Sequence, residues 1–152
     1  NDQRLVQTSL FLGIEMDPLK DNPQQGDFLI RNIMGADKES GGVQVGAMLR
    51  EGQLVQFHLR DKDMSSEDLR LVLNRYKAKE HSKKAAGALL FSCLGRGQYL
   101  YGKPNHDSDM FHDQLGDIPL GGFFCNGEIG PVGKTTFLHG YTSSFGIFHP
   151  TH

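Results

Sequence analysis

Residues 86–130 read AGALLFSCLGRGQYLYGKPNHDSDMFHDQLGDIPLGGFFCNGEIG and contain two apolar runs, each followed by a polar turn that bears glycine. The runs are residues 88–91 and 120–124, and the turns are residues 92–97 and 125–130. Short apolar runs bounded by turn residues are typical of buried strands. Glycine lets a loop take positive φ angles or approach another group closely. We therefore predict that two strands present Arg96 and Glu128 from tight loops that lie side by side and form a small-molecule pocket.

Length and composition favour one globular domain over residues 1–152. The apolar content of 38% and the charged content of 22% are ordinary for such a domain. The 16 basic and 18 acidic residues give a net charge of −2, which gives no electrostatic reason to expect nucleic-acid binding. No apolar run approaches the ~18 residues of a membrane-spanning helix, so we expect no membrane insertion. The chain opens at Asn1 without a methionine, and we expect a piece of a longer protein.

Short strands dominate the first sixty residues of the predicted fold. Residues 8–14, 28–34 and 43–45 are apolar runs, and residues 55–60 alternate apolar and polar side chains, as a half-buried strand does. We expect these strands to form an antiparallel meander. Residues 136–148 are aromatic and β-branched, and we expect one long bent strand or a hairpin there.

Two helices are predicted between these strands. The longer one begins at Ser65 as its N-cap and has an apolar face with i, i+3, i+4, i+7 spacing. The members of that face are Leu69, Val72, Leu73 and Tyr76. A shorter helix over residues 109–115 is capped by Ser108 and ended by Gly116. The predicted fold class is α+β, with a largely antiparallel or mixed β-sheet and two or three helices packed on it.

Arg96 and Glu128 are the leading candidates for ligand contact. An amino-acid ligand presents a carboxylate, which the arginine fork matches with two hydrogen bonds, and an ammonium group, which a glutamate accepts. The alternative is that Arg96 and Glu128 pair with each other and only fix the two turns, because buried charges need a partner. The residues leave both interpretations open.

A P-loop-like stretch occurs at residues 130–136, which read GPVGKTT. Glu128 stands where the phosphate-binding motif needs a glycine, and a strand-like segment follows where the motif needs a helix. We interpret these residues as a turn between two strands, with Lys134 in solvent.

Enzymatic chemistry is the weaker hypothesis. A thiolate nucleophile at Cys93 needs a lowered pKa and a nearby base, for which Arg96 and His139 are candidates. A lone cysteine at a strand end is more often a small buried hydrophobic residue. His106 and His112, with their neighbouring aspartates, are metal-ligand types, but an acidic helix start explains them equally. We expect no enzyme, no catalytic residue, no metal and no cofactor.

The quoted stretch resembles a known family. The segments LLFSCLGRG and IPLGGFFCNGEIGP, followed by TFLHGYTSSFGIF, are similar to the C-terminal half of the FIST sensory domain (F-box and intracellular signal transduction). Residues 28–33, 42–46 and 49–60 resemble the opening strands of that half. The resemblance covers nearly the whole chain, and its most specific elements are Cys-x-Gly-Arg and Asn-Gly-Glu-Ile-Gly.

The resemblance implies a sensory role beside signalling modules, or a place in an F-box protein, with no established catalytic residues. It also implies an N-terminal FIST half and a signalling output domain as partners outside this chain. Its signature positions include Gly130. The predicted ligand-binding residues are Arg96, Asn126 and Glu128, supported by Cys93, Gly95, Gly127 and Arg31.

We therefore predict a small-ligand-sensing domain of a cytoplasmic signal-transduction protein, with amino acids among its candidate ligands. Ligand binding would shift the balance between two conformations. Two cysteines are too few for a disulfide scaffold, and we expect Cys93 and Cys125 to be unbridged in a reducing cytoplasm. The alternative function is a protein-interaction module, as in an F-box substrate receptor, which predicts an exposed apolar patch. An exposed sheet edge would also allow a homodimer.

Overall fold

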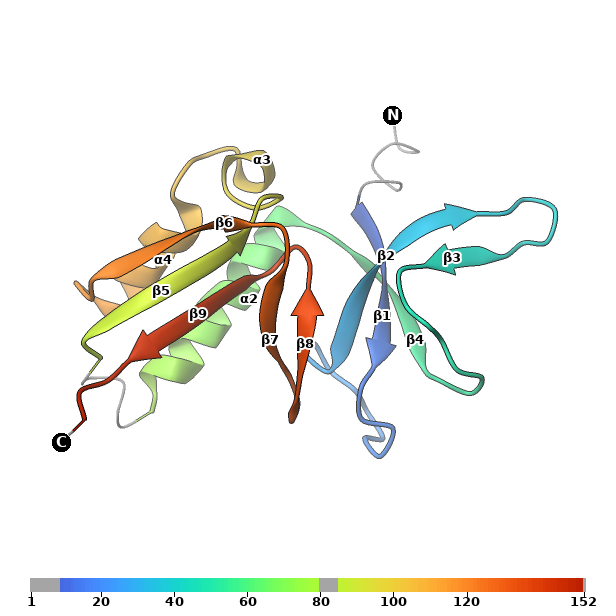
Figure 1. Cartoon of the computed structure of the whole chain (residues 1–152), viewed down its shortest axis with the longest axis horizontal. Coiled ribbons are helices and arrows are strands. Elements are labelled where there is room, and N and C mark those ends of the chain that lie inside the picture. Colours follow the sequence, from blue (N-terminus) through green and yellow to red (C-terminus); the bar gives the residue numbers. More distant parts are fainter. Residues whose placement is uncertain (1–8, 80–84, 152) are drawn as a thin grey trace. The chain divides into compact units, whose positions relative to one another are not determined.

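A computed structural model of the chain describes residues 9–79 and 85–151, which divide into two compact units (Figure 1). Unit 1 comprises the chain up to Asp61 together with Ile129–His139, and unit 2 comprises Lys62–Glu128 together with the chain from Gly140. Most strand pairs of the described residues are antiparallel, one pair is parallel, and helices pack beside them, so the α+β prediction is confirmed. A single domain over residues 1–152 stays a prediction.

The main sheet of unit 1 has four strands in the order β3-β2-β1-β4. These are β1 (Leu10–Glu15), β2 (Phe28–Ala36), β3 (Val43–Val45) and β4 (Val55–Leu59). Strands β1, β2 and β3 form the predicted antiparallel meander, but β4 returns to the far side of β1 and pairs with it antiparallel. A meander of all four strands is therefore wrong. Because β1 has a neighbour on each side, Phe11, Leu12 and Ile14 are all buried.

A two-stranded hairpin, of which Ile129–His139 belong to this unit, completes unit 1. Strands β7 (Glu128–Val132) and β8 (Thr135–His139) pair with each other. The turn between them contains Gly133 at φ 59°, a backbone conformation that glycine adopts without strain. Val132 packs with Ile14 and Leu29 in the core of this unit. The P-loop-like residues therefore form a strand, a turn and a strand, as predicted.

Unit 2 is built around a three-stranded sheet in the order β6-β5-β9. Its elements are α2 (Lys62–Lys77), β5 (Gly87–Cys93), α3 (Gln98–Tyr101), α4 (His106–Leu115), β6 (Leu120–Cys125) and β9 (Ser143–Phe148). Strands β5 and β6 are parallel, and α3 and α4 form the crossover between them, whereas β9 is antiparallel to β5. Figure 1 shows α2 and α4 together behind this sheet.

The core of unit 2 lies between these two helices and one face of the sheet. Leu69 and Leu73 of α2, Ala88 of β5 and Phe111 of α4 form its buried cluster. The ring of Phe111, which is fully buried, stacks on that of Phe145 with 5.5 Å between centroids. Val72, which we predicted on the buried face of α2, is 44% exposed because Leu69 and Leu73 already fill the contact with α4.

The predicted starts of both helices and the predicted structure of residues 136–148 are wrong. Helix α2 begins three residues before Ser65, and α4 begins at His106 with Asn105 rather than Ser108 as its N-cap. Gly116 ends α4 as predicted. Residues 136–148 are neither one strand nor a hairpin, because β8 pairs with β7 whereas β9 pairs with β5. Tyr141, at φ 60°, lies at the break between them. Within the described residues, no helix combines the length and apolarity that a membrane crossing requires.

Candidate functional site

The carboxyl ends of β5 and β6 bring the two predicted loops side by side. The parallel pairing continues to the last residue of each strand, where Cys93 lies opposite Cys125. The amide of Leu94 then donates to the carbonyl of Cys125 at 2.9 Å, which joins the starts of the two loops. The predicted adjacency of these loops is therefore confirmed. The carboxyl ends of parallel strands are frequent ligand sites in α/β sheets.

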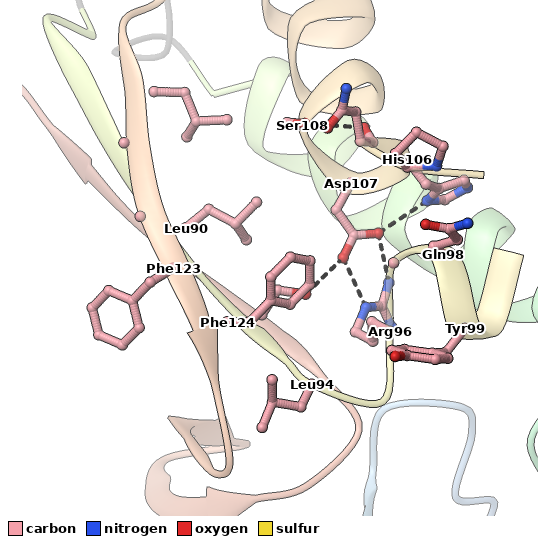
Figure 2. Close-up of a pocket in the computed structure, with 17 residues that line it drawn as sticks. Leu90, Leu94, Arg96, Gln98, Tyr99, His106, Asp107, Ser108, Phe123 and Phe124 are labelled. Atoms are coloured by element: carbon pink, nitrogen blue, oxygen red, sulfur yellow. Dashed lines mark hydrogen bonds and ion pairs between the residues drawn. The ribbon is translucent and has the colours of Figure 1, made fainter. Parts of the chain in front are cut away.

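A cavity of about 600 Å³, the hollow, lies along the edge strand β6, between β6 and the α3–α4 crossover, and reaches the carboxyl ends of β5 and β6 (Figure 2). Its lining consists of Leu90, Ser92, Leu94, Arg96, Gly97, Gln98, Tyr99, Pro104, Asn105, His106, Asp107, Ser108, Leu120, Gly121, Gly122, Phe123 and Phe124. All of these residues belong to unit 2.

A buried ion pair lies at the side of the hollow that α4 provides. Arg96 donates from Nε to Oδ2 of Asp107 at 2.8 Å and from Nη2 to Oδ1 at 3.1 Å. Both residues are only 6% exposed. Arg96 comes from the loop after β5, and Asp107 lies in the first turn of α4, where the helix dipole favours a carboxylate. The ion pair therefore ties the end of the strand to the start of the helix.

Three further groups complete the coordination of the Asp107 carboxylate. The hydroxyls of Ser92 and Ser143 donate to Oδ2 at 3.1 and 2.6 Å, and Nδ1 of His106 lies 2.9 Å from Oδ1. The imidazole of His106 also stacks on the ring of Tyr101, with 3.4 Å between centroids. The phenolic oxygen of Tyr101 accepts from Nη2 of Arg96 at 2.5 Å. The network therefore connects β5, β9, α3 and α4.

The network keeps both charges in place. Burial alone would raise the pKa of Asp107, but the hydrogen bonds and charge of Arg96, with those from Ser143 and His106, hold it well below its usual range. Burial alone would likewise lower the pKa of Arg96, and Asp107 outweighs that effect and raises it. Both groups are therefore ionised at neutral pH.

Glu128 faces a different environment. It is 1% exposed at the first position of β7, and its oxygens accept from the Cys125 thiol at 3.3 Å and from the amide of Thr142 at 3.4 Å. Burial and the carboxylate of Glu128 raise the pKa of the Cys125 thiol. Glu128 does not line the hollow, and Arg96 pairs with Asp107 instead. The prediction that Arg96 and Glu128 line one pocket is therefore wrong for the hollow. The alternative, that these two residues pair with each other, is also wrong, because Asp107 is the partner of Arg96.

Comparison with known proteins identifies the family. The family profile described as the FIST C domain matches residues 1–131, most of the chain. This chain belongs to the FIST C domain family. Membership indicates a sensory domain of a signal-transduction protein, and the resemblance drawn from the sequence is confirmed.

The relatives of this FIST C domain are longer proteins. Two Mycobacterium tuberculosis proteins, each described as uncharacterized, are 44% and 41% identical over 148 residues, which is 97% of this chain and 38% of each relative. An F-box/LRR-repeat protein of Arabidopsis thaliana is 28% identical over 143 residues, 84% of this chain and 27% of that protein. Human F-box only protein 22 is 31% identical over 108 residues, 60% of this chain and 27% of that protein. The chain thus spans less than two fifths of the length of these relatives.

The remaining predicted site residues of this FIST C domain do not line the hollow. Cys93 is buried, Asn126 is exposed, and Gly95 and Gly127 are half-buried in the two loops. Arg31 belongs to unit 1, where its Nη1 donates to the carbonyl of Leu138 at 3.0 Å. Gly130 is also in unit 1, and its carbonyl lies 2.9 Å from Nε2 of His139. A ligand-binding role for these residues stays a prediction.

Asp107 and its serine partners are the residues that sequence reasoning missed. We placed Asp107 in a candidate metal cluster, but the described residues hold no group of three or more metal-ligating side chains. A buried arginine requires a nearby carboxylate, and Asp107, in the acidic start of the next helix, was a second candidate beside Glu128. Ser92 and Ser143 carried no signal, because serine is common at strand ends.

Proposed function

We propose that the hollow is the site at which this FIST C domain senses a small molecule within a cytoplasmic signalling protein. The observation that carries the proposal is the position of the hollow along the edge strand β6. The hollow reaches the carboxyl ends of the parallel strands β5 and β6 and lies next to a network of buried polar side chains. Ligand pockets are usually concave, mostly apolar and largely pre-formed, with a few placed polar groups. The hollow has these properties.

The elements around the hollow offer a route for a signal. The network joins the loop after β5, helix α3, the start of α4 and, through Ser143, strand β9. A ligand that changes the packing of Phe124 or Leu94 would act on residues next to this network. Ligands shift a conformational equilibrium only by as much as they bind one state better than the other. We propose that the output domain of the longer protein reads such a shift.

We propose binding rather than catalysis at this site. Cys93 is buried, and no hydrogen bond joins it to a histidine within the part of the chain that the structure describes. The raised pKa of Cys125 disfavours its thiolate, the nucleophilic form. An amino-acid ligand, which the sequence favoured, stays a prediction, but the hollow lacks the Glu128 carboxylate on which that prediction depended.

NMR mapping tests the proposed site. Amide chemical shifts of the chain would be followed while indole, phenol, L-leucine and L-tryptophan are added one at a time. We expect at least one compound to move the signals of Ser92, Leu94 and Phe124. Leu90→Phe, which narrows the hollow, should weaken the effect, and Leu89→Phe, on the opposite face of the same strand, should leave it intact. No shift with any compound, or shifts confined to the face of Leu89, would overturn the proposal.

A second candidate function is protein interaction, as the F-box relatives suggest. The sheet face opposite α2 and α4 carries Leu89, Phe123 and Phe148, which are 38%, 63% and 55% exposed. Exposed apolar patches often mark protein contacts. Hydrogen exchange in the full-length protein separates the two functions. A partner domain on this face would slow exchange around Leu89 and Phe123, whereas a small ligand would slow exchange around Ser92 and Leu94.

A further inference from the structure

The charged groups in the wall of the hollow are already neutralised by each other. Among the described residues that line it, Arg96 and Asp107 are the only members of the arginine, lysine, aspartate and glutamate types. The Nε–Nη2 edge of Arg96, which would grip a ligand carboxylate, is taken by Asp107. A carboxylate ligand would therefore compete with an internal carboxylate that is already held at two points.

The Asp107 carboxylate likewise has no capacity left for a ligand ammonium group. An ionised carboxylate offers about four lone-pair sites. Asp107 already makes two contacts with Arg96 and one each with Ser92, Ser143 and His106. A cationic ligand would enter the hollow without a free carboxylate to pair with its charge, and an unpaired charge is costly to remove from water.

The start of α4 does not attract an anion either. Helix N-termini bind anions through free amides and the helix dipole. Here the first turn of α4 carries Asp107 and Asp109, and their negative charges offset the positive potential of the helix N-terminus. The hollow therefore favours neither sign of charge in a ligand.

Apolar surface, in contrast, is available to a ligand. Figure 2 shows the ring of Phe124 directed toward Arg96 and Asp107, while the ring of Phe123 points away from them. Phe124 is 56% exposed and Leu94 is 55% exposed, so both retain surface that a ligand can cover. Phe124 lies over Gly97, where an added Cβ would approach its Cζ to 3.0 Å. The absence of a side chain at Gly97 thus provides the space in which the ring lies.

We infer that the ligand of the hollow is an uncharged aromatic molecule, of the chemical class of indole or phenol, and not a free amino acid. Its ring packs on Phe124 and on the leucines of β5 and β6. The exposed amide side chains of Gln98 and Asn105 supply neutral donors and acceptors for one polar substituent. This inference rests on the proposed function of the hollow.

Four probes that share one ring test the inference: indole, tryptamine, indole-3-propionate and L-tryptophan. They are respectively neutral, cationic, anionic and zwitterionic at pH 7. Titration calorimetry and NMR shift mapping on the chain should show indole binding at least tenfold tighter than each charged probe. Phe124→Ala should weaken indole binding at least fivefold. Phe148→Ala, an exposed change on the opposite face of the sheet, should alter indole binding less than twofold, with circular dichroism to confirm folding of both variants.

The outcomes separate the ligand class from the site. Equal or tighter binding of L-tryptophan at the hollow would overturn the ligand class and leave the proposed site standing. Tighter binding of only tryptamine or only indole-3-propionate than of indole would also overturn the ligand class. Such a result would show whether the hollow prefers a cationic or an anionic ligand. Absence of binding by all four probes, or binding that Phe124→Ala leaves unchanged, would overturn both the ligand class and the site.

Discussion

Arg96 and Asp107 form a two-point ion pair, with 2.8 Å between Nε and Oδ2 and 3.1 Å between Nη2 and Oδ1, and each residue is 6% exposed. Removing one partner of a buried pair leaves the other charge without compensation, at a typical cost of about 3–5 kcal/mol. We expect Asp107→Asn to lower the free energy of unfolding by about 3 kcal/mol, measured by urea denaturation. Asp109→Asn, an exposed change in the same helical turn, should cost about 0.5 kcal/mol. Equal effects of the two substitutions would contradict a special role for the pair.

The same pair predicts sensitivity to acid. The pKa of Asp107 in the folded chain lies well below its ordinary value of 3.8. Its contribution to stability is therefore complete above that value and is lost as the pH falls below it. Urea denaturation of the wild type between pH 5 and pH 2 should show a fall in the free energy of unfolding that steepens below about pH 3.8. The fall should be shallower in Asp107→Asn, and parallel curves for the two proteins would refute this account.

His58 predicts a second pH dependence, in unit 1. Burial lowers its pKa below the ordinary 6.5, and its Nε2 is buried without a hydrogen-bond partner among the described residues. His58 therefore binds a proton more readily in the unfolded chain than in the folded one. The free energy of unfolding should fall as the pH drops below about 6.5. His58→Phe keeps the ring against Phe28 and should flatten the curve between pH 7.5 and 5.5. His112→Gln, an exposed change in unit 2, should leave the curve as it is; if His58→Phe does the same, another group is responsible.

Adjacent glycines in β6 provide a matched test of the sheet. Gly122 has φ 148°, and a Cβ there would lie 1.9 Å from the carbonyl oxygen of Leu90, which is backbone and cannot turn away. At Gly121 a Cβ would meet only the side chain of Leu89, at 3.6 Å. We expect Gly122→Ala to destabilise the chain by about 3 kcal/mol, and Gly121→Ala by less than about 1 kcal/mol, in thermal or urea unfolding. Comparable losses would show that the pairing of β5 with β6 is not what Gly122 protects.

Thiol chemistry tests the environment of Glu128. Burial and the neighbouring carboxylate raise the pKa of Cys125, so its reaction with iodoacetamide should be slower at pH 7 than that of an ordinary cysteine and should accelerate as the pH rises. Glu128→Gln removes the negative charge and should shift the pH–rate profile to lower pH. The measurement is made in Cys93→Ser, so that a single thiol is labelled. An unchanged profile in Glu128→Gln would mean that burial alone sets the reactivity.

Patterns among residues close together in the sequence predicted many strands and helices of this fold and the adjacency of the loops after β5 and β6. Alternating residues located β4, the spacing of Leu69 and Leu73 located α2, and Gly133 marked a turn. Two similar segments, each an apolar strand followed by a turn with glycine, led us to predict that their loops are neighbours. The pairing of Cys93 with Cys125 at the ends of β5 and β6 confirms that prediction. The break at Tyr141 could not be predicted, because nothing in the composition of residues 136–148 separates one sheet from another.

The sequence alone thus determined most of the strands and turns and the family, since each depends on residues close together in the chain. Only the tertiary structure decided which acid neutralises Arg96. Asp107 and Glu128 are equally suitable in chemistry, and both follow Arg96 in the chain. The crossover returns the first turn of α4 to the end of β5, which places Asp107 within hydrogen-bond distance of the guanidinium, whereas Glu128 turns to Cys125 and Thr142. Because that choice depends on distances between segments rather than on residue type, no pattern of side chains could have revealed it.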